Sequence, residues 1–120
     1  IMATITRAHL TGSTDGVPFG LAVDTGTLTV VHATNTTAGN FEEVWIWLAN
    51  INTSTEIVTL AFGGTGAANK MIIQVPAEST ILAVPGITFD GKSSTGVTVA
   101  GGSTTADKVN VFGHINLITA

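Results

Sequence analysis

Charged side chains are scarce in this sequence. Only 10% of its 120 residues are Asp, Glu, Lys or Arg, against about 25% in an average soluble domain. Thr, Gly and Ala stand where Lys and Glu would ordinarily cover the surface. Because a soluble monomer usually covers itself with charge, we expect copies of this chain or a larger assembly to cover it instead.

Cysteine is absent altogether. Its absence excludes disulfides, thiolate zinc sites, iron–sulfur clusters and cysteine nucleophiles. The length predicts a single domain over residues 1–120, large enough to bury a core without a disulfide or a metal.

Positive charge and long apolar runs are also missing. The four basic residues are scattered, at Arg7, Lys70, Lys92 and Lys108. Nucleic-acid binding needs clustered positive charge, so we predict no nucleic-acid partner. The longest apolar run, Val44–Ala49, falls far short of the roughly 20 residues of a membrane helix, so we predict no membrane partner. The start of the chain has no basic stretch before an apolar run, so no signal peptide is predicted.

What the sequence does contain is a two-residue alternation of apolar and polar side chains. This period predicts an all-β fold, a single-domain β-sandwich or jelly roll of eight to ten short antiparallel strands. The expected strands are Met2–Leu10, Phe19–Val23, Thr27–Ala33, Phe41–Asn50, Glu56–Phe62, Lys70–Val75, Thr80–Val84, Ile87–Phe89, Gly96–Ala100 and Val109–Ile118.

Three of these segments carry a more specific expectation. Phe41–Asn50 ends in a nearly continuous apolar run, which predicts a central strand buried on both faces. Pro76 and Pro85 are expected to stop the strands that precede them. Residues 1–10 are expected to form either an arm that packs on a neighbouring molecule or an edge strand.

Two glycine-containing segments match nucleotide-binding patterns only superficially. Gly86–Ser93 fits the P-loop pattern, but its middle residues alternate like a strand and another strand follows where a P-loop needs a helix. We therefore predict a strand that ends in a hairpin at Asp90-Gly91. Gly63–Asn69 lacks the last glycine of a dinucleotide fingerprint, so we predict a mobile loop.

No arrangement of residues predicts catalysis. His9, His32 and His114 lie on three different expected strands, without the spacing of a local metal site, so we predict half-buried or interface histidines and no metal. Titration of an interface histidine would make assembly sensitive to pH. Glu42 and Glu43 are adjacent and point to opposite faces of a strand, so they cannot act as a paired acid and base. We predict no catalytic residue and no cofactor.

Trp45 and Trp47 share one face of their strand. Two tryptophans so placed can form a platform for a sugar, or they can anchor the core or a subunit contact. Together with His9, His32 and His114, they are the candidate interface residues.

The order of strands and turns from Val44 to Ile118 resembles that of small all-β virion proteins of tailed bacteriophages, in particular head decoration (cement) proteins. The resemblance covers about two thirds of the chain. It is carried by Leu-Ala-Asn (Leu48–Asn50), the aliphatic strand Glu56–Phe62, Pro-Ala-Glu-Ser-Thr (Pro76–Thr80), Pro85-Gly86, the Asp-Gly turn and Val-Asn-Val-Phe-Gly-His-Ile (Val109–Ile115).

The resemblance implies a structural role on the outer surface of a phage head, after synthesis in the host cytoplasm. Decoration proteins commonly form homotrimers that tie neighbouring major capsid proteins together. The partners implied are thus the major capsid protein and the chain itself. The alternative is a receptor- or glycan-binding module of a tail fibre or baseplate. An enzyme is a third hypothesis, for which the P-loop match is the only argument.

Overall fold

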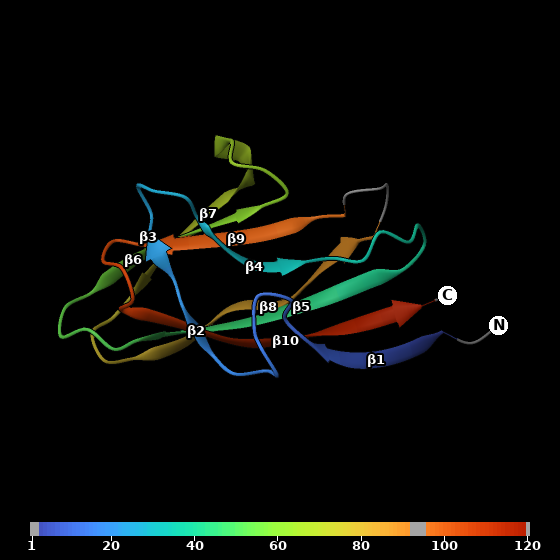
Figure 1. Ribbon diagram of the computed structural model, residues 1–120, viewed down its shortest axis with the longest axis horizontal. Coiled ribbons are helices and arrows are strands. Elements are labelled where there is room, and N and C mark those ends of the chain that lie inside the picture. The colour runs from blue at the N-terminus through green and yellow to red at the C-terminus, as the bar shows by residue number, and fades with distance from the viewer. Residues whose placement is uncertain (1–2, 92–95, 120) are drawn as a thin grey trace.

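Two β-sheets packed face to face make up the molecule (Figure 1). The computed structural model describes residues 3–91 and 96–119. Its elements are β1 (Thr4–His9), β2 (Phe19–Gly20), β3 (Ala22–Val23), β4 (Thr29–Ala33), β5 (Phe41–Asn50), β6 (Glu56–Phe62), a 3₁₀ helix η1 (Ala67–Asn69), β7 (Lys70–Val75), β8 (Thr80–Asp90), β9 (Thr98–Ser103) and β10 (Val109–Thr119).

The strand order is that of a jelly roll. Sheet A runs β1-β10-β5-β8, with β2 also beside β10, and sheet B runs β3-β9-β6-β7, with β4 also beside β9. Among the eight longer strands, the first therefore pairs with the last, the second with the seventh, the third with the sixth and the fourth with the fifth. These pairs are antiparallel, and among the described strands only the two-residue β3 runs parallel to its neighbour, β9. The predicted all-β sandwich is confirmed.

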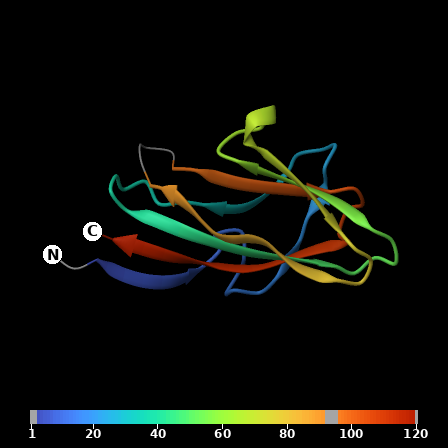
Figure 2. The same ribbon diagram turned by 180° about the vertical axis from the view of Figure 1, so that it is seen from behind.

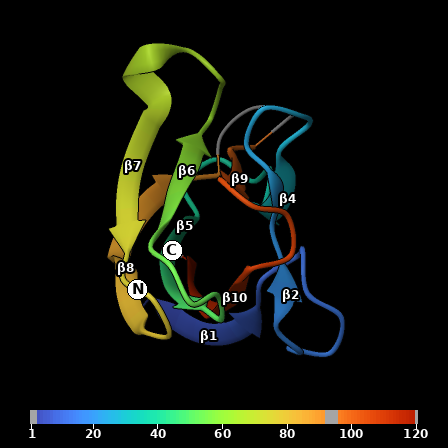
Figure 3. The same ribbon diagram turned by 90° about the vertical axis from the view of Figure 1, so that its left-hand side faces the viewer.

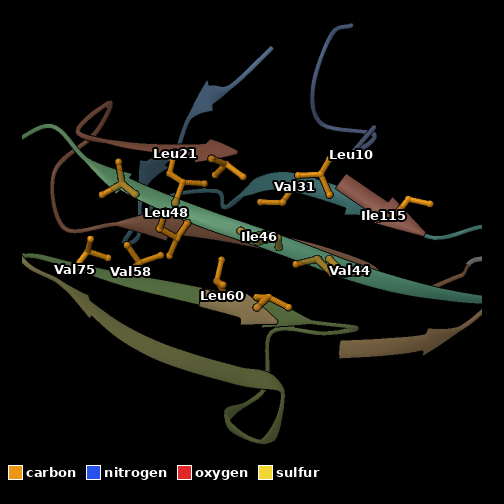
Figure 4. Close-up of a cluster of buried hydrophobic side chains, with 14 residues drawn as sticks. Leu10, Leu21, Val31, Val44, Ile46, Leu48, Val58, Leu60, Val75 and Ile115 are labelled. Carbon is orange, nitrogen blue, oxygen red and sulfur yellow. The ribbon is translucent and has the colours of Figure 1, made fainter. Parts of the chain in front are cut away.

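Aliphatic side chains fill the space between the sheets (Figure 4). An end view shows the two sheets on opposite sides of the molecule (Figure 3). The fourteen residues of the cluster are all Val, Ile or Leu, which suits the pleated inner surface of a sandwich. They are Leu10, Leu21, Val31, Val44, Ile46, Leu48, Val58, Leu60, Val75, Val84, Val99, Val109, Val111 and Ile115.

The central strand β5 is buried on one face only. Its bounds, Phe41–Asn50, match the prediction, but the expectation of burial on both faces is wrong. Buried and less buried residues alternate along its whole length. In a sandwich only the inner face of each sheet packs on the other sheet, so Trp45 and Trp47 lie on the outer face.

Pro85 does not stop its strand, contrary to expectation. The segments Thr80–Val84 and Ile87–Phe89 belong to one strand, β8, at the edge of sheet A. An edge strand tolerates proline, because the side of the strand that faces solvent needs no N–H partner. The pairing with β5 shifts by one residue beside Pro85, and Gly86 takes a positive φ of 73° there. This is a bulge of the kind that protects sheet edges.

Three other connections differ from the prediction. The hairpin expected at Asp90-Gly91 is absent, because β8 pairs within sheet A and the next strand, β9, belongs to sheet B. Part of the P-loop match, residues 92–93, lies outside the described residues. Phe19–Val23 divides at Leu21, where the chain passes from sheet A to sheet B. The expected loop Gly63–Asn69 ends in η1, which projects beyond the sheets (Figure 2).

Strand β1 is an edge strand of sheet A. It pairs with β10 over six residues, from Thr4 opposite Thr119 to His9 opposite His114. All six residues are exposed, so β1 buries no side chain. Ordering the backbone of one residue costs about 1–2 kcal/mol, whereas one backbone hydrogen bond contributes a net of about 0.5–1.5 kcal/mol. Backbone hydrogen bonds alone therefore do little more than offset the cost of ordering β1 in an isolated molecule.

We expect Ile46→Ala to lower the free energy of unfolding by about 2–5 kcal/mol, because it leaves a cavity among side chains that cannot fully collapse around it. Ile46 is fully buried, whereas Ile72 on β7 is 61% exposed. The matched substitution Ile72→Ala should change the free energy of unfolding by about 0.5 kcal/mol or less. Urea denaturation of both variants measures the difference, and similar losses in the two would contradict this description of the core.

Candidate functional site

The outer face of sheet A carries the most distinctive surface of the molecule. Its side chains form four rows that run across the strands, and we call these four rows the aromatic face. The rows are Ile5, Ile118, Phe41 and Asp90; Arg7, Asn116, Glu43 and Thr88; His9, His114, Trp45 and Pro85; and Phe112, Trp47 and Leu82.

The aromatic face follows directly from the alternation of the strands. The inner residues of β5 are Glu42, Val44, Ile46, Leu48 and Asn50. Residues between them must point outward, and the register with β10 sets His114 opposite Trp45 and Phe112 opposite Trp47. The row of Arg7, Asn116 and Glu43 is polar and the other three rows are mainly apolar or aromatic, although Asp90 lies opposite Phe41 at the end of one of them.

Three rings form the centre of this face. The ring centroids of Trp45 and Trp47 are 6.4 Å apart, those of Trp45 and His114 6.2 Å, and those of Trp47 and His114 5.8 Å. Trp45 also lies over Gly86, where an added Cβ would come within 2.8 Å of the indole. A glycine at this bulge thus leaves room for the indole against β8.

The row beside the rings is polar and hydrogen-bonded internally. Arg7 Nε donates to Asn116 Oδ1 at 3.4 Å, and Asn116 Nδ2 donates to Glu43 Oε1 at 3.1 Å. Trp45 Nε1 donates to the same oxygen at 3.4 Å. One positive and one negative charge are therefore bridged by an amide, so the row is neutral. Polar groups that already bond to one another lose less free energy when a partner removes them from water.

The structure brings together four of the five candidate residues, and His32 is the exception. Trp45, Trp47 and His114 form the ring cluster, and His9 is paired with His114 in register. The His9 ring packs close to Gly16. His32 lies in the interior instead, on the inner side of β4. Whether the four form an interface remains a prediction.

His32 belongs to a buried network that the sequence analysis missed. The backbone N–H of Thr11 donates to His32 Nδ1 at 3.1 Å, so the proton of the neutral ring is on Nε2. Nε2 lies 2.5 Å from Glu42 Oε1. The other carboxylate oxygen accepts from the backbone N–H of Asn35 at 2.5 Å and from its side chain at 2.7 Å. The network joins β4, β5, the connection between β1 and β2 at Thr11, and the segment after β4 at Asn35.

Hydrogen bonding keeps Glu42 ionised despite its burial. Burial by itself raises the pKa of Glu42, but the bonds from Asn35 and His32 outweigh it and hold the pKa below its ordinary value of 4.5. A signal for this residue was present in the sequence. Glu42 has the same parity along the strand as Val44 and Ile46, so a strand with those residues inside must bury it.

A second buried carboxylate lies at the opposite end of the core. Glu56 accepts from the backbone N–H of Thr105 at 2.8 Å and from Asn52 Nδ2 at 3.0 Å. Burial raises the pKa of Glu56, and these bonds, with the charge of Lys108, lower it overall. Beside it, the buried Asn50 donates to the carbonyls of Ser54, Val75 and Pro76. Two of the eight acidic residues are thus withdrawn from an already weakly charged surface.

The outer face of sheet B exposes the large apolar side chains Ile57 and Ile72. A depression there is lined by Asp24, Thr25, Gly26, Leu28, Thr59, Thr65 and Lys70. These side chains supply one carboxylate, one ammonium group and three hydroxyls. Within residues 3–91 and 96–119, no helix has the length and apolar character needed to cross a membrane.

Neither a known family model nor a curated protein matches this sequence. A function is therefore inferred from the surface and its chemistry.

Stability should fall in acid because of the two buried carboxylates. The pKa of each is below 4.5 in the folded chain, so their stabilisation is fully present above pH 4.5 and is lost as the pH falls through the lower, folded-state pKa. Glu42→Gln should lower the free energy of unfolding at pH 7 by about 1–3 kcal/mol and make its decline below pH 4.5 shallower. Urea denaturation from pH 7 to pH 3 measures both effects. The control is the exposed Glu78→Gln, and an equal change in the two variants would contradict the role of Glu42.

His114 should titrate below the ordinary histidine pKa of 6.5. Burial lowers the pKa of His114, the charge of Arg7 lowers it further, and Glu43 partly opposes both. Arg7→Gln should therefore raise the midpoint of the His114 ring signals in an NMR titration. Lys108→Gln, near the far end of the sandwich, should leave the midpoint unchanged. A lower midpoint in the Arg7 variant would contradict the placement of Arg7 on this face.

Proposed function

We propose that this protein is a structural component of a bacteriophage virion, a decoration protein that binds the outside of the head and bridges neighbouring major capsid proteins. The observation that carries the proposal is the aromatic face. Of the nine large apolar side chains that the described part of the chain exposes, four lie there: Ile5, Phe41, Leu82 and Phe112.

The composition of this face suits contact with protein. Aromatic residues and arginine are enriched at interfaces, whereas unpaired charges are depleted in interface cores. Here the row of Arg7, Asn116 and Glu43 is neutral and bonded within itself, so a partner can cover that row without isolating a charge. Burial of the rows on either side supplies the favourable free energy. The jelly-roll fold is shared by viral capsid domains and lectins, which agrees with the proposal but does not select it.

The proposed mechanism is multivalent binding. Each contact is modest, and several copies held in one homotrimer engage the shell together, so the contacts add through effective concentration. Only an expanded shell presents all contact points at the required spacing. Because the protein binds the assembled shell and not its separated subunits, it stabilises the shell by mass action. Scarce surface charge is consistent with a surface that is largely covered in the virion.

A receptor- or glycan-binding module of a tail fibre or baseplate is a second candidate. It is favoured by the ring cluster next to hydrogen-bonding groups, since Trp45, Trp47 and His114 stand beside Glu43 and Asn116. Sugars bind by stacking on rings while their hydroxyls bond to such groups. A glycan array separates the candidates, because this module should give hits that Trp47→Ala abolishes.

The test of the decoration proposal is binding to expanded heads that lack decoration, prepared from the phage that encodes this chain. The purified protein should have a native mass of about three times 12.2 kDa. It should co-sediment with the heads and raise the temperature at which they disrupt. The double variant Leu82→Ala/Phe112→Ala should bind at least about tenfold more weakly, since buried anchors each contribute more than about 1 kcal/mol.

The matched control is Ile57→Ala/Ile72→Ala on the outer face of sheet B. Ile57 and Phe112 are similarly exposed, at 40% and 44%, so the two variants remove comparable surface from opposite faces. The control should bind like the unaltered protein. Failure of the unaltered protein to bind expanded heads would overturn the proposal, and loss of binding in the control alone would move the contact to sheet B.

A further inference from the structure

Strand β1 is attached to its own molecule almost entirely through its backbone. Its six residues are exposed, and none of them belongs to the core cluster. It is held by the six-residue register with β10, by the bond from Arg7 to Asn116 and by the bond from Thr119 Oγ1 to the carbonyl of Thr4. All of these contacts are made to one neighbour, β10.

The chain immediately after β1 is fixed firmly. Leu10 is 1% exposed within the core. The N–H of Thr11 donates to His32, and the N–H of Gly12 donates to the carbonyl of Val31. A hinge between His9 and Leu10 would therefore release the whole of β1, and the unit that moves ends at His9. Opening this hinge releases β1 at the loss of the local packing of His9 on Gly16, without disturbing any core side chain.

The two edges of sheet A differ in their protection. At the β8 edge, Pro85 and two register shifts against β5 interrupt regular pairing. The pairing of β1 with β10 continues through all six residues without a shift. If β1 moves away, it exposes a regular edge on β10. The structure shows which strand fits this edge, because β1 itself pairs there in a continuous register.

We propose that β1 is exchanged between copies of this chain, so that β1 of each copy pairs with β10 of the next around a closed ring. Every contact that β1 makes with β10 within one molecule can be made between molecules with the same register, which makes exchange a low-cost route to an oligomer. The exchange also places β1 against a second molecule, whose surface can cover side chains of β1 that are exposed in a single copy. Ile5, which is 68% exposed, is the largest apolar side chain among them.

The exchange makes the aromatic face a composite of two copies. Arg7 then bonds to Asn116 of the next copy, and the neutral polar row is completed only in the assembly. Ile5 likewise joins Ile118 and Phe41 of the next copy in the outermost apolar row. This inference concerns self-association, and it does not depend on what the aromatic face binds.

Engineered disulfides test the exchange cleanly, because the chain contains no cysteine. In Thr4→Cys/Thr119→Cys, the paired positions lie on opposite strands at the spacing that a disulfide accepts. After oxidation, exchange links different chains, so a denaturing, non-reducing gel should show covalent oligomers. Pairing within one molecule would show only the single-chain mass.

The control pair is Thr59→Cys/Ile72→Cys, which joins β6 to β7 in sheet B. It should give single chains only, under the same oxidation and at the same protein concentration. Sizing with light scattering on both samples shows whether the protein is associated before oxidation. Single chains from the β1–β10 pair in an associated sample would overturn the exchange, as would a protein that stays monomeric at every concentration. Neither outcome bears on binding to heads, which is measured separately.

Discussion

The inward row of β5 is the constraint on which the rest of this structure depends. That row begins with a carboxylate, continues with three aliphatic side chains and ends with an amide: Glu42, Val44, Ile46, Leu48 and Asn50. A slip of one residue would bury Trp45 and Trp47 and expose all five. Since β5 lies between β10 and β8, its register fixes both neighbours, and the outer rows of sheet A are set by the same pairing.

The polar side chains at the two ends of that row also join β5 to neighbouring segments by hydrogen bonds. Glu42 ties β5 to β4 and to the loop at Asn35, while Asn50 reaches the carbonyls of Val75 and Pro76 at the far end. Each buried polar group in these networks has its partners, so burial does not carry the cost of an unpaired donor or acceptor. The same arrangement removes carboxylates from the surface, so the fold itself adds to the scarcity of charge that the composition already imposes.

The sequence predicted the fold class and several strands well. Residues that point to the two faces of a strand alternate in polarity in segments such as Phe41–Asn50, Glu56–Phe62 and Lys70–Val75, and this alternation can be seen without a structure. It could not show which face of Phe41–Asn50 is covered, since that depends on the second sheet. Nor could it show that Pro85 lies at an edge, where a missing N–H is harmless. The pair of His32 and Glu42 needed tertiary contacts, although the parity of Glu42 already pointed inward. The shared face of Trp45 and Trp47 was predictable, whereas the neutral row beside it required the register with β10.

The pairing of the first long strand with the last has a mechanical consequence. Thr4 and Thr119 face each other at the same end of the molecule, so a pulling force applied through both ends of the chain would act on β1 and β10 at one point. Their hydrogen bonds would then break one after another, as in unzipping, rather than all together in shear. Tension of this kind would peel β1 away as far as His9 and stop at Leu10, which is locked in the core. The core side chains lie outside β1, so β1 would open before the strands that carry them.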